Sequence, residues 1–141
     1  MDSCLELEKH VALVLDIHHH WCHSAGEYIE VNDDRVKRVI DSWRGVRPAM
    51  HYSISKEDYL TEHRHDTRPS MEDLLHRGYK KAKLRAHSDM CWNTACNEWA
   101  LSFSDDFDIM VEAKHKNLAS TQLYNQQFQQ KHPIQFQSRI Y

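Results

Sequence analysis

The chain has 141 residues, enough for one domain with a buried core, and its 40% hydrophobic and 28% charged residues are typical of a folded protein. The formal net charge of −3 argues weakly against broad binding to phosphate backbones. No apolar run reaches the roughly 20 residues that a bilayer-spanning helix needs, and the first residues lack the layout of a signal peptide. We therefore expect no membrane association and a cytoplasmic location, in which the cysteines stay reduced.

Three apolar segments predict strands. Residues 11–17 form a nearly continuous apolar run, which indicates a strand buried on both faces, and it ends in Asp16 and three histidines. Residues 49–55 predict a second short strand, and residues 107–113 predict another buried strand.

Helices are predicted between and after these strands. Apolar residues recur with helical spacing over residues 36–43 and 92–103, and a polar helix is expected over residues 117–130. Ser70 and Asp73 resemble an N-terminal capping pair, so a helix should start there and continue into the basic stretch at residues 77–85. We expect the domain to span residues 1–132 and to be followed by an irregular tail over residues 133–141.

This order of strands and helices is typical of a parallel α/β protein, in which the chemistry lies at the carboxyl ends of the strands. Polar residues follow that rule here. Asp16 and the histidines end the first strand, His51 lies in the second and Glu112 ends the last. His87 precedes a helix and is a candidate for a further strand end.

A cluster of these groups would suit a divalent metal, because Mn, Zn and Fe accept mixed imidazole and carboxylate ligands. The candidate set is Asp16, His19, His51, His87 and Glu112. Spacing alone does not choose among His18, His19 and His20. Any single histidine is more often solvated than metal-bound, whereas a carboxylate at the end of an apolar run needs a partner.

A basic stretch offers the best local candidates for contacts with phosphate groups. Its five members are Arg77, Lys80, Lys81, Lys83 and Arg85. A solvated helix face is the commoner role for such a stretch.

Four segments in order, "LVLDIHHH", "MHYS", "AHSDM" and "DIMVEAKHK", resemble the UV damage endonuclease family. The resemblance implies a TIM-barrel endonuclease with a cluster of divalent metal ions, most often Mn, with Zn or Mg as possible substitutes. Such enzymes nick double-stranded DNA on the 5′ side of UV photoproducts and related lesions and so start excision repair. The resemblance therefore also implies that the protein is found in the compartment that holds the DNA. The implied metal ligands are Asp16, His19, His51, His87 and Glu112, since the family pattern Asp-x-x-His selects His19.

The resemblance covers the carboxyl half of the family's barrel. We therefore expect a partial TIM barrel of about three or four βα units, and a second chain that supplies the other half is a candidate partner. Many members carry a Lys, modified to a metal-bridging carbamate, where this chain has Ala49. Residues 56–86 are longer than the corresponding family segment, so His63 or His65 could take the role of His87.

Two other functions remain open on the sequence. One is a catalytically inactive remnant or a His-rich metal-binding module. The other is a different metal-dependent TIM-barrel enzyme, such as an apurinic-site endonuclease.

Overall fold

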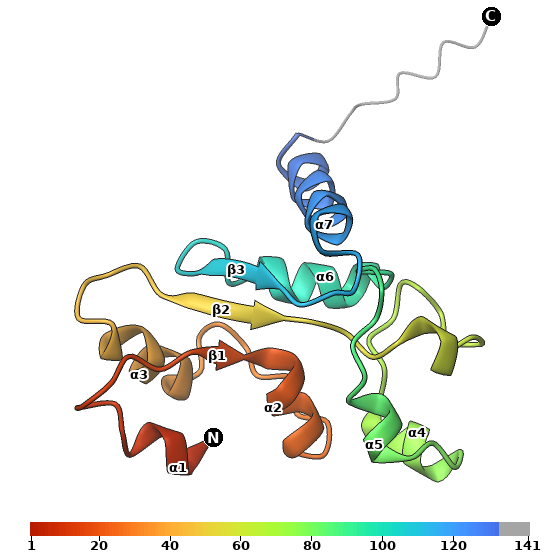
Figure 1. The fold of residues 1–141 in the computed structure, drawn as a ribbon, viewed down its shortest axis with the longest axis horizontal. Coiled ribbons are helices and arrows are strands. Elements are labelled where there is room, and N and C mark those ends of the chain that lie inside the picture. The colour runs from red at the N-terminus through yellow and green to blue at the C-terminus, as the bar shows by residue number, and fades with distance from the viewer. Residues whose placement is uncertain (133–141) are drawn as a thin grey trace, which may run out of the picture.

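A three-stranded parallel sheet forms the centre of the protein in the computed structural model, which describes residues 1–132 (Figure 1). The strands are β1 (Leu15–Asp16), β2 (Ala49–Tyr52) and β3 (Asp108–Val111), arranged in the order β1-β2-β3. The helices are α1 (Asp2–Leu5), α2 (Ile17–His23), α3 (Asp34–Ser42), α4 (Met71–His76), α5 (Lys81–Leu84), α6 (Thr94–Leu101) and α7 (Lys116–Lys131), with a 3-10 turn, η1, at Glu57–Tyr59. None of these helices is both long and apolar enough to cross a membrane.

Side-chain caps start several of the helices, and the cap at Ser70 confirms the capping signal in the sequence. Asp33 accepts a hydrogen bond from the Arg35 backbone and starts α3, and Ser70 accepts one from the Asp73 backbone and starts α4. Asn93 caps α6 in the same way. Such caps satisfy amide groups that the first turn of a helix leaves without partners.

The register of the sheet divides its residues between two faces, because successive side chains of a strand point to opposite sides. Leu15 pairs with Met50, and Met50 pairs with Ile109. On this face Leu15, Met50 and Tyr52 are buried. The Tyr52 hydroxyl donates to Asn97 Oδ1 of α6 at 2.6 Å, and the Leu13 backbone donates to Ser42 Oγ of α3, so both helices cover this face.

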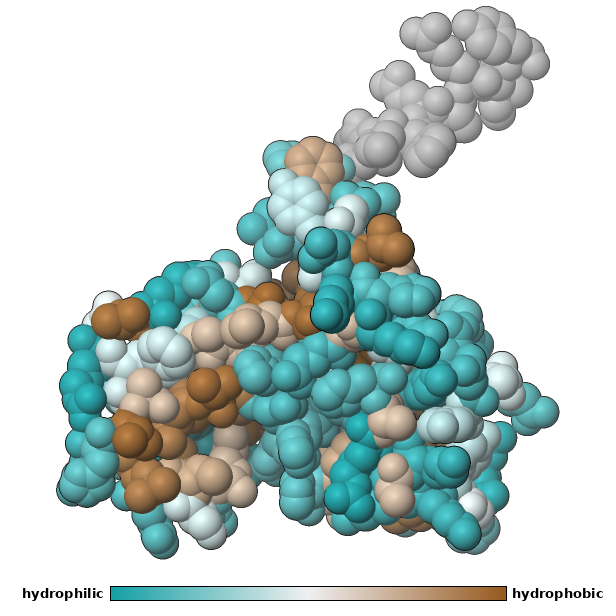
Figure 2. Space-filling view, viewed as in Figure 1, coloured by the Kyte–Doolittle hydropathy of each residue, from teal (hydrophilic) through white to brown (hydrophobic). Residues whose placement is uncertain are grey.

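The opposite face of the sheet, which we call the open face, is not covered by any described element. Asp16 pairs with His51, which pairs with Met110, so these three residues share the open face. Met110 remains 54% exposed, and Val14, two residues before Asp16, remains 52% exposed. Figure 2 shows hydrophobic residues exposed among hydrophilic ones in the region of α1 and β1. The prediction that residues 11–17 are buried on both faces is therefore wrong, because only one face of the sheet is packed. The prediction of a buried strand over residues 107–113 is wrong for the same reason.

The structure confirms the predicted α/β class with parallel strands, but it does not confirm the partial TIM barrel. The α/β class, the parallel strands and their sequential order fit part of such a barrel, but residues 1–132 do not close one. The further strand end suggested for His87 is absent from this described sheet. His87 instead forms an isolated antiparallel bridge with Ser55.

The expected continuous basic helix is also wrong. Gly78 has a φ of +92° and turns the chain after α4, so that the basic residues fall on a loop and on the short helix α5. The tail expected over residues 133–141 lies outside the described residues.

Arg47 fixes β3 against the start of β2. Its Nε donates to Asp108 Oδ1 at 2.7 Å, and its other guanidinium nitrogens donate to the backbone carbonyls of Ser104, Asp105 and Phe107. The planar guanidinium carries five N–H donors in a fixed arrangement, so one side chain can hold a whole turn in place. This anchor lies at the amino ends of the strands, opposite the candidate ligands.

Gly26 permits the close packing of the turn after α2 against α4. It has a φ of +104°, and an added Cβ would overlap the Cβ of Met71, which is buried. We predict that Gly26→Ala lowers the free energy of unfolding by about 2 kcal/mol or more, from backbone strain together with overpacking.

Gly78→Ala is the matched control. Gly78 also has a positive φ, of +92°, but an added Cβ would enter open space. The destabilisation should stay near about 1 kcal/mol, the cost of backbone strain alone. Urea denaturation of both variants measures the difference, and equal effects would contradict the packing role of Gly26.

Candidate metal centre

Asp16 ends β1 and starts α2 in a single residue. Its backbone is extended, and its Oδ1 accepts a hydrogen bond from the His19 backbone N–H at 2.8 Å. The carboxylate therefore caps the helix, which makes the chain leave the sheet directly after Asp16. The strand predicted over residues 11–17 accordingly keeps only Leu15 and Asp16, and the three histidines lie on the helix.

Three side chains meet at the carboxyl ends of the three strands. Asp16, His51 and Glu112 each offer one ligand atom, and these atoms lie within 4.8 Å of one another. His51 Nδ1 lies 3.0 Å from Glu112 Oε1. Glu112 follows β3 and donates its backbone N–H to the Tyr52 carbonyl, so the parallel ladder carries it to the open face beside His51. We call these residues the carboxylate–histidine triad.

The donors of this triad fit a divalent ion. Two carboxylates and one imidazole form a mixed oxygen and nitrogen set, and all three residues are partly exposed, so an ion can reach them. Because two carboxylates close together repel each other, a cation between them would stabilise the arrangement. The triad supplies three ligands and leaves room for others.

The histidine triplet divides into three environments. His18 is buried, and its ring lies between Ser53 and Ser55, which follow β2. His20 Nε2 lies 2.6 Å from Glu27 Oε2, and Glu27 also pairs with Arg35. Only His19 turns to the open surface beside Asp16, with its Nδ1 3.9 Å from Asp16 Oδ2.

The tautomer of His18 follows from its neighbours. Ser55 Oγ donates to the Leu84 carbonyl at 2.6 Å, so it must accept from His18 Nε2 at 3.3 Å. Nδ1 is then the acceptor, and Ser53 Oγ donates to it at 3.0 Å. Burial, and next the nearby His87, lower the pKa of His18 to about 4, so the ring is neutral at neutral pH. His18 thus ties α2 to the segment after β2.

His87 and its two alternatives are not part of the triad. His87 is exposed, and its ring meets the edge of the His18 ring with centroids 5.8 Å apart. The alternatives His63 and His65 pack against the edge of Trp92, and His65 Nε2 lies 3.5 Å from Glu57. The structure therefore groups Asp16, His51 and Glu112. His19 lies beside Asp16 of that group, and His87 lies beside His18.

All five predicted phosphate-binding residues are exposed. Arg77 lies 3.5 Å from Glu62, and the Lys83 ammonium lies over the Tyr59 ring. No ion pair within residues 1–132 involves the other three, which are Lys80, Lys81 and Arg85.

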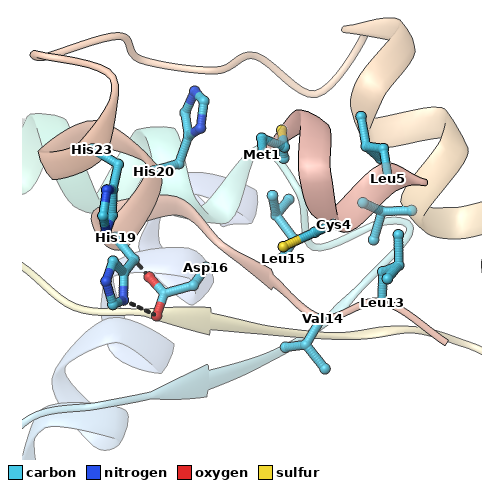
Figure 3. Close-up of a pocket in the computed structure, with 11 residues that line it drawn as sticks. Met1, Cys4, Leu5, Leu13, Val14, Leu15, Asp16, His19, His20 and His23 are labelled. Atoms are coloured by element: carbon cyan, nitrogen blue, oxygen red, sulfur yellow. Dashed lines mark hydrogen bonds and ion pairs between the residues drawn. The ribbon is translucent and has the colours of Figure 1, made fainter. Parts of the chain in front are cut away.

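A pocket of about 380 Å³ lies beside the triad, between α1, β1 and α2 (Figure 3). Its apolar side includes Cys4, Leu13 and Leu15, and its polar side carries Asp16 and three histidines of α2, which are His19, His20 and His23. The sequence prediction gave His23 no place in the candidate site, although its spacing of four residues from His19 is visible in the sequence.

The fold and the site together define an α/β protein with a candidate metal centre at the carboxyl edge of a parallel sheet. The family model for UV-endonuclease UvdE matches residues 3–139, and the chain belongs to this family. No curated protein and no solved structure matches the chain. The family is one of DNA repair endonucleases, and its match agrees with the resemblance seen in the four sequence segments.

We predict that Glu112→Gln and His51→Gln each weaken Mn²⁺ binding at least about tenfold, because removing a ligand should cost no less than removing a supporting hydrogen bond to a ligand. Isothermal titration of the metal-free chain with Mn²⁺ measures this change. His10→Gln replaces an exposed histidine outside the candidate ligand set and serves as the control. Unchanged Mn²⁺ affinity in both triad variants would contradict the assignment.

Proposed function

We propose that this chain takes part in metal-dependent hydrolysis of the DNA phosphodiester bond on the 5′ side of UV photoproducts and related lesions, in excision repair. The observation that carries the proposal is the carboxylate–histidine triad at the ends of three adjacent parallel strands. Membership of the UV-endonuclease family supports the choice of DNA as the substrate.

The roles of the residues follow from their chemistry. Asp16, His51 and Glu112 would hold a divalent ion, and His19 and His87 would complete its surroundings or hold a second ion. Two carboxylates favour a hard ion, which supports Mn over softer metals, with Zn and Mg as alternatives. Bound there, a divalent ion would polarise the scissile phosphate and make water more acidic.

The protein side chains would position this chemistry. Asp16 has one oxygen fixed by the backbone of α2, so its direction is set before any ion arrives. His18, held neutral between two serines, keeps α2 in place against the segment after β2. Such preorganisation lowers the cost of assembling a site.

The open face supports the further proposal that a second chain completes the site. Val14 and Met110 are apolar and about half exposed beside the triad, where a closed barrel would bury such side chains. A second chain that supplied the other half of a barrel would cover this face and add ligands and DNA-binding residues.

We predict nicking of a UV-irradiated duplex in the presence of Mn²⁺, with rates at least about a hundredfold lower for Glu112→Gln, because a misplaced or missing metal removes most electrostatic stabilisation. The assay uses end-labelled DNA, with unirradiated duplex and chelator as controls. It is run with this chain alone and with the amino-terminal half of a family member added.

The two arms separate the possibilities. Activity only with the added half indicates that a second chain is needed, and activity without it removes that requirement. Mn²⁺ binding with no cleavage in either arm would contradict the nuclease proposal and favour a non-catalytic metal-binding module. Cleavage of abasic DNA alone would favour an apurinic-site endonuclease.

The exposed basic residues before and within α5 are the proposed binding groups for the DNA backbone. Lys80 and Lys81 are the best placed, because neither ammonium is held in an ion pair within residues 1–132. We predict that Lys80→Ala/Lys81→Ala weakens DNA binding, and that the slope of log affinity against log salt falls by about one for each phosphate group that the variant no longer neutralises.

Fluorescence anisotropy at several salt concentrations measures this slope. Lys9→Ala/Lys37→Ala removes the same charge from exposed positions elsewhere and should leave the slope nearly unchanged. Equal changes in the two double variants would show that only net charge matters and would contradict a local role in DNA binding.

A further inference from the structure

The solvent-facing side of α2 carries a pair of histidines one helical turn apart. His19 and His23 stand at positions i and i+4, which a helix brings onto the same face. Their rings stack, with centroids 4.9 Å apart and planes inclined by 15° (Figure 3). The two imidazoles therefore already lie side by side, and little ordering would be needed to bring both to one ligand.

These two rings are available, unlike the other two histidines of the helix. His18 is buried between serines, and His20 is held by Glu27. His19 and His23 are exposed. Within residues 1–132, the His19 ring has one ion-pair partner, Asp16 at 3.9 Å, and no hydrogen bond or ion pair involves the ring of His23.

The chemistry of such a pair selects a class of metal. Two imidazoles on one helix face can chelate a borderline transition ion such as Zn²⁺ or Co²⁺, whereas Mn²⁺ prefers oxygen-rich sites. Asp16 Oδ2 lies 3.9 Å from His19 Nδ1, and Asp16 lines the same pocket as both histidines. Its carboxylate can therefore turn toward an ion held by the histidine pair. Solvent would fill the remaining positions, because both rings are exposed.

We propose that His19 and His23, with Asp16 at their border, form a second metal site that takes Zn²⁺ or Co²⁺. This site is distinct from the carboxylate–histidine triad, which it adjoins through Asp16. It uses His23, to which the proposed nuclease centre assigns no role, and it can exist whether or not the chain cleaves DNA. Binding there would join two successive turns of α2 and so stabilise the helix that carries Asp16 at its start.

The test measures metal stoichiometry and affinity rather than nuclease activity. Co²⁺ is titrated into the metal-free full chain and followed by visible absorption, and Zn²⁺ binding is measured by calorimetry and native mass spectrometry. We expect His23→Gln to lose one bound Zn²⁺ or to bind it at least about tenfold more weakly, while Mn²⁺ affinity stays unchanged. Because His23 is exposed, the variant should fold, which circular dichroism verifies.

Two further variants make the result specific. His76→Gln replaces another exposed histidine on a helix, one that ends α4, and should keep the full Zn²⁺ stoichiometry. His51→Gln/Glu112→Gln disrupts the triad and should lose Mn²⁺ while keeping Zn²⁺ at the histidine pair. Failure of the nuclease proposal is thereby separated from failure of this one.

Either of two results would overturn the proposal. One is a His23→Gln variant that binds Zn²⁺ and Co²⁺ with the stoichiometry and affinity of the unaltered chain. The other is loss of all Zn²⁺ binding in His51→Gln/Glu112→Gln, which would mean that the only site is the triad.

Discussion

The hydrogen bond from the His19 backbone to the Asp16 carboxylate decides the shape of the whole candidate site. It turns the chain from strand to helix within one residue, so the histidines that follow are spread around α2 instead of alternating along a strand. One consequence is that His18 points into the core, His20 meets Glu27 and His19 stays beside Asp16 of the candidate metal centre. The other is that Asp16, fixed through one oxygen, meets His51 and Glu112 with a defined direction.

Much of the fold could be predicted from sequence, because its signals are local. The capping pair at Ser70 marks the start of α4, and the apolar stripes mark the buried faces of α3 and α6. The failures have a common physical cause. An apolar run such as residues 11–17 indicates what a strand could bury but not what is present to cover it, and Val14 and Met110 therefore stayed exposed.

The candidate site was predictable in part for the same reason. Asp16 ends β1, His51 lies near the end of β2 and Glu112 follows β3. Parallel strands bring their carboxyl ends together, so the order of the strands was enough to predict that these three residues lie close to one another. The positions of His18 and His87 depend on the segment after β2. Ser55 of that segment contacts His18, donates to the Leu84 carbonyl and forms a bridge with His87, and all of these partners are distant in sequence. The role of Arg47 was also invisible, because its four acceptors lie some sixty residues away.

The position of the Arg47 anchor has an evolutionary consequence. It secures β2 and β3 at the amino ends of the strands, while the candidate ligands lie at the carboxyl ends. The helices α3 and α6 cover the face of the sheet opposite the open face. Selection for folding and selection for chemistry thus act on separate sets of residues. A lineage could exchange or lose the ligands at one edge of this sheet while keeping its architecture, and the anchor would hold the scaffold ready for new chemistry.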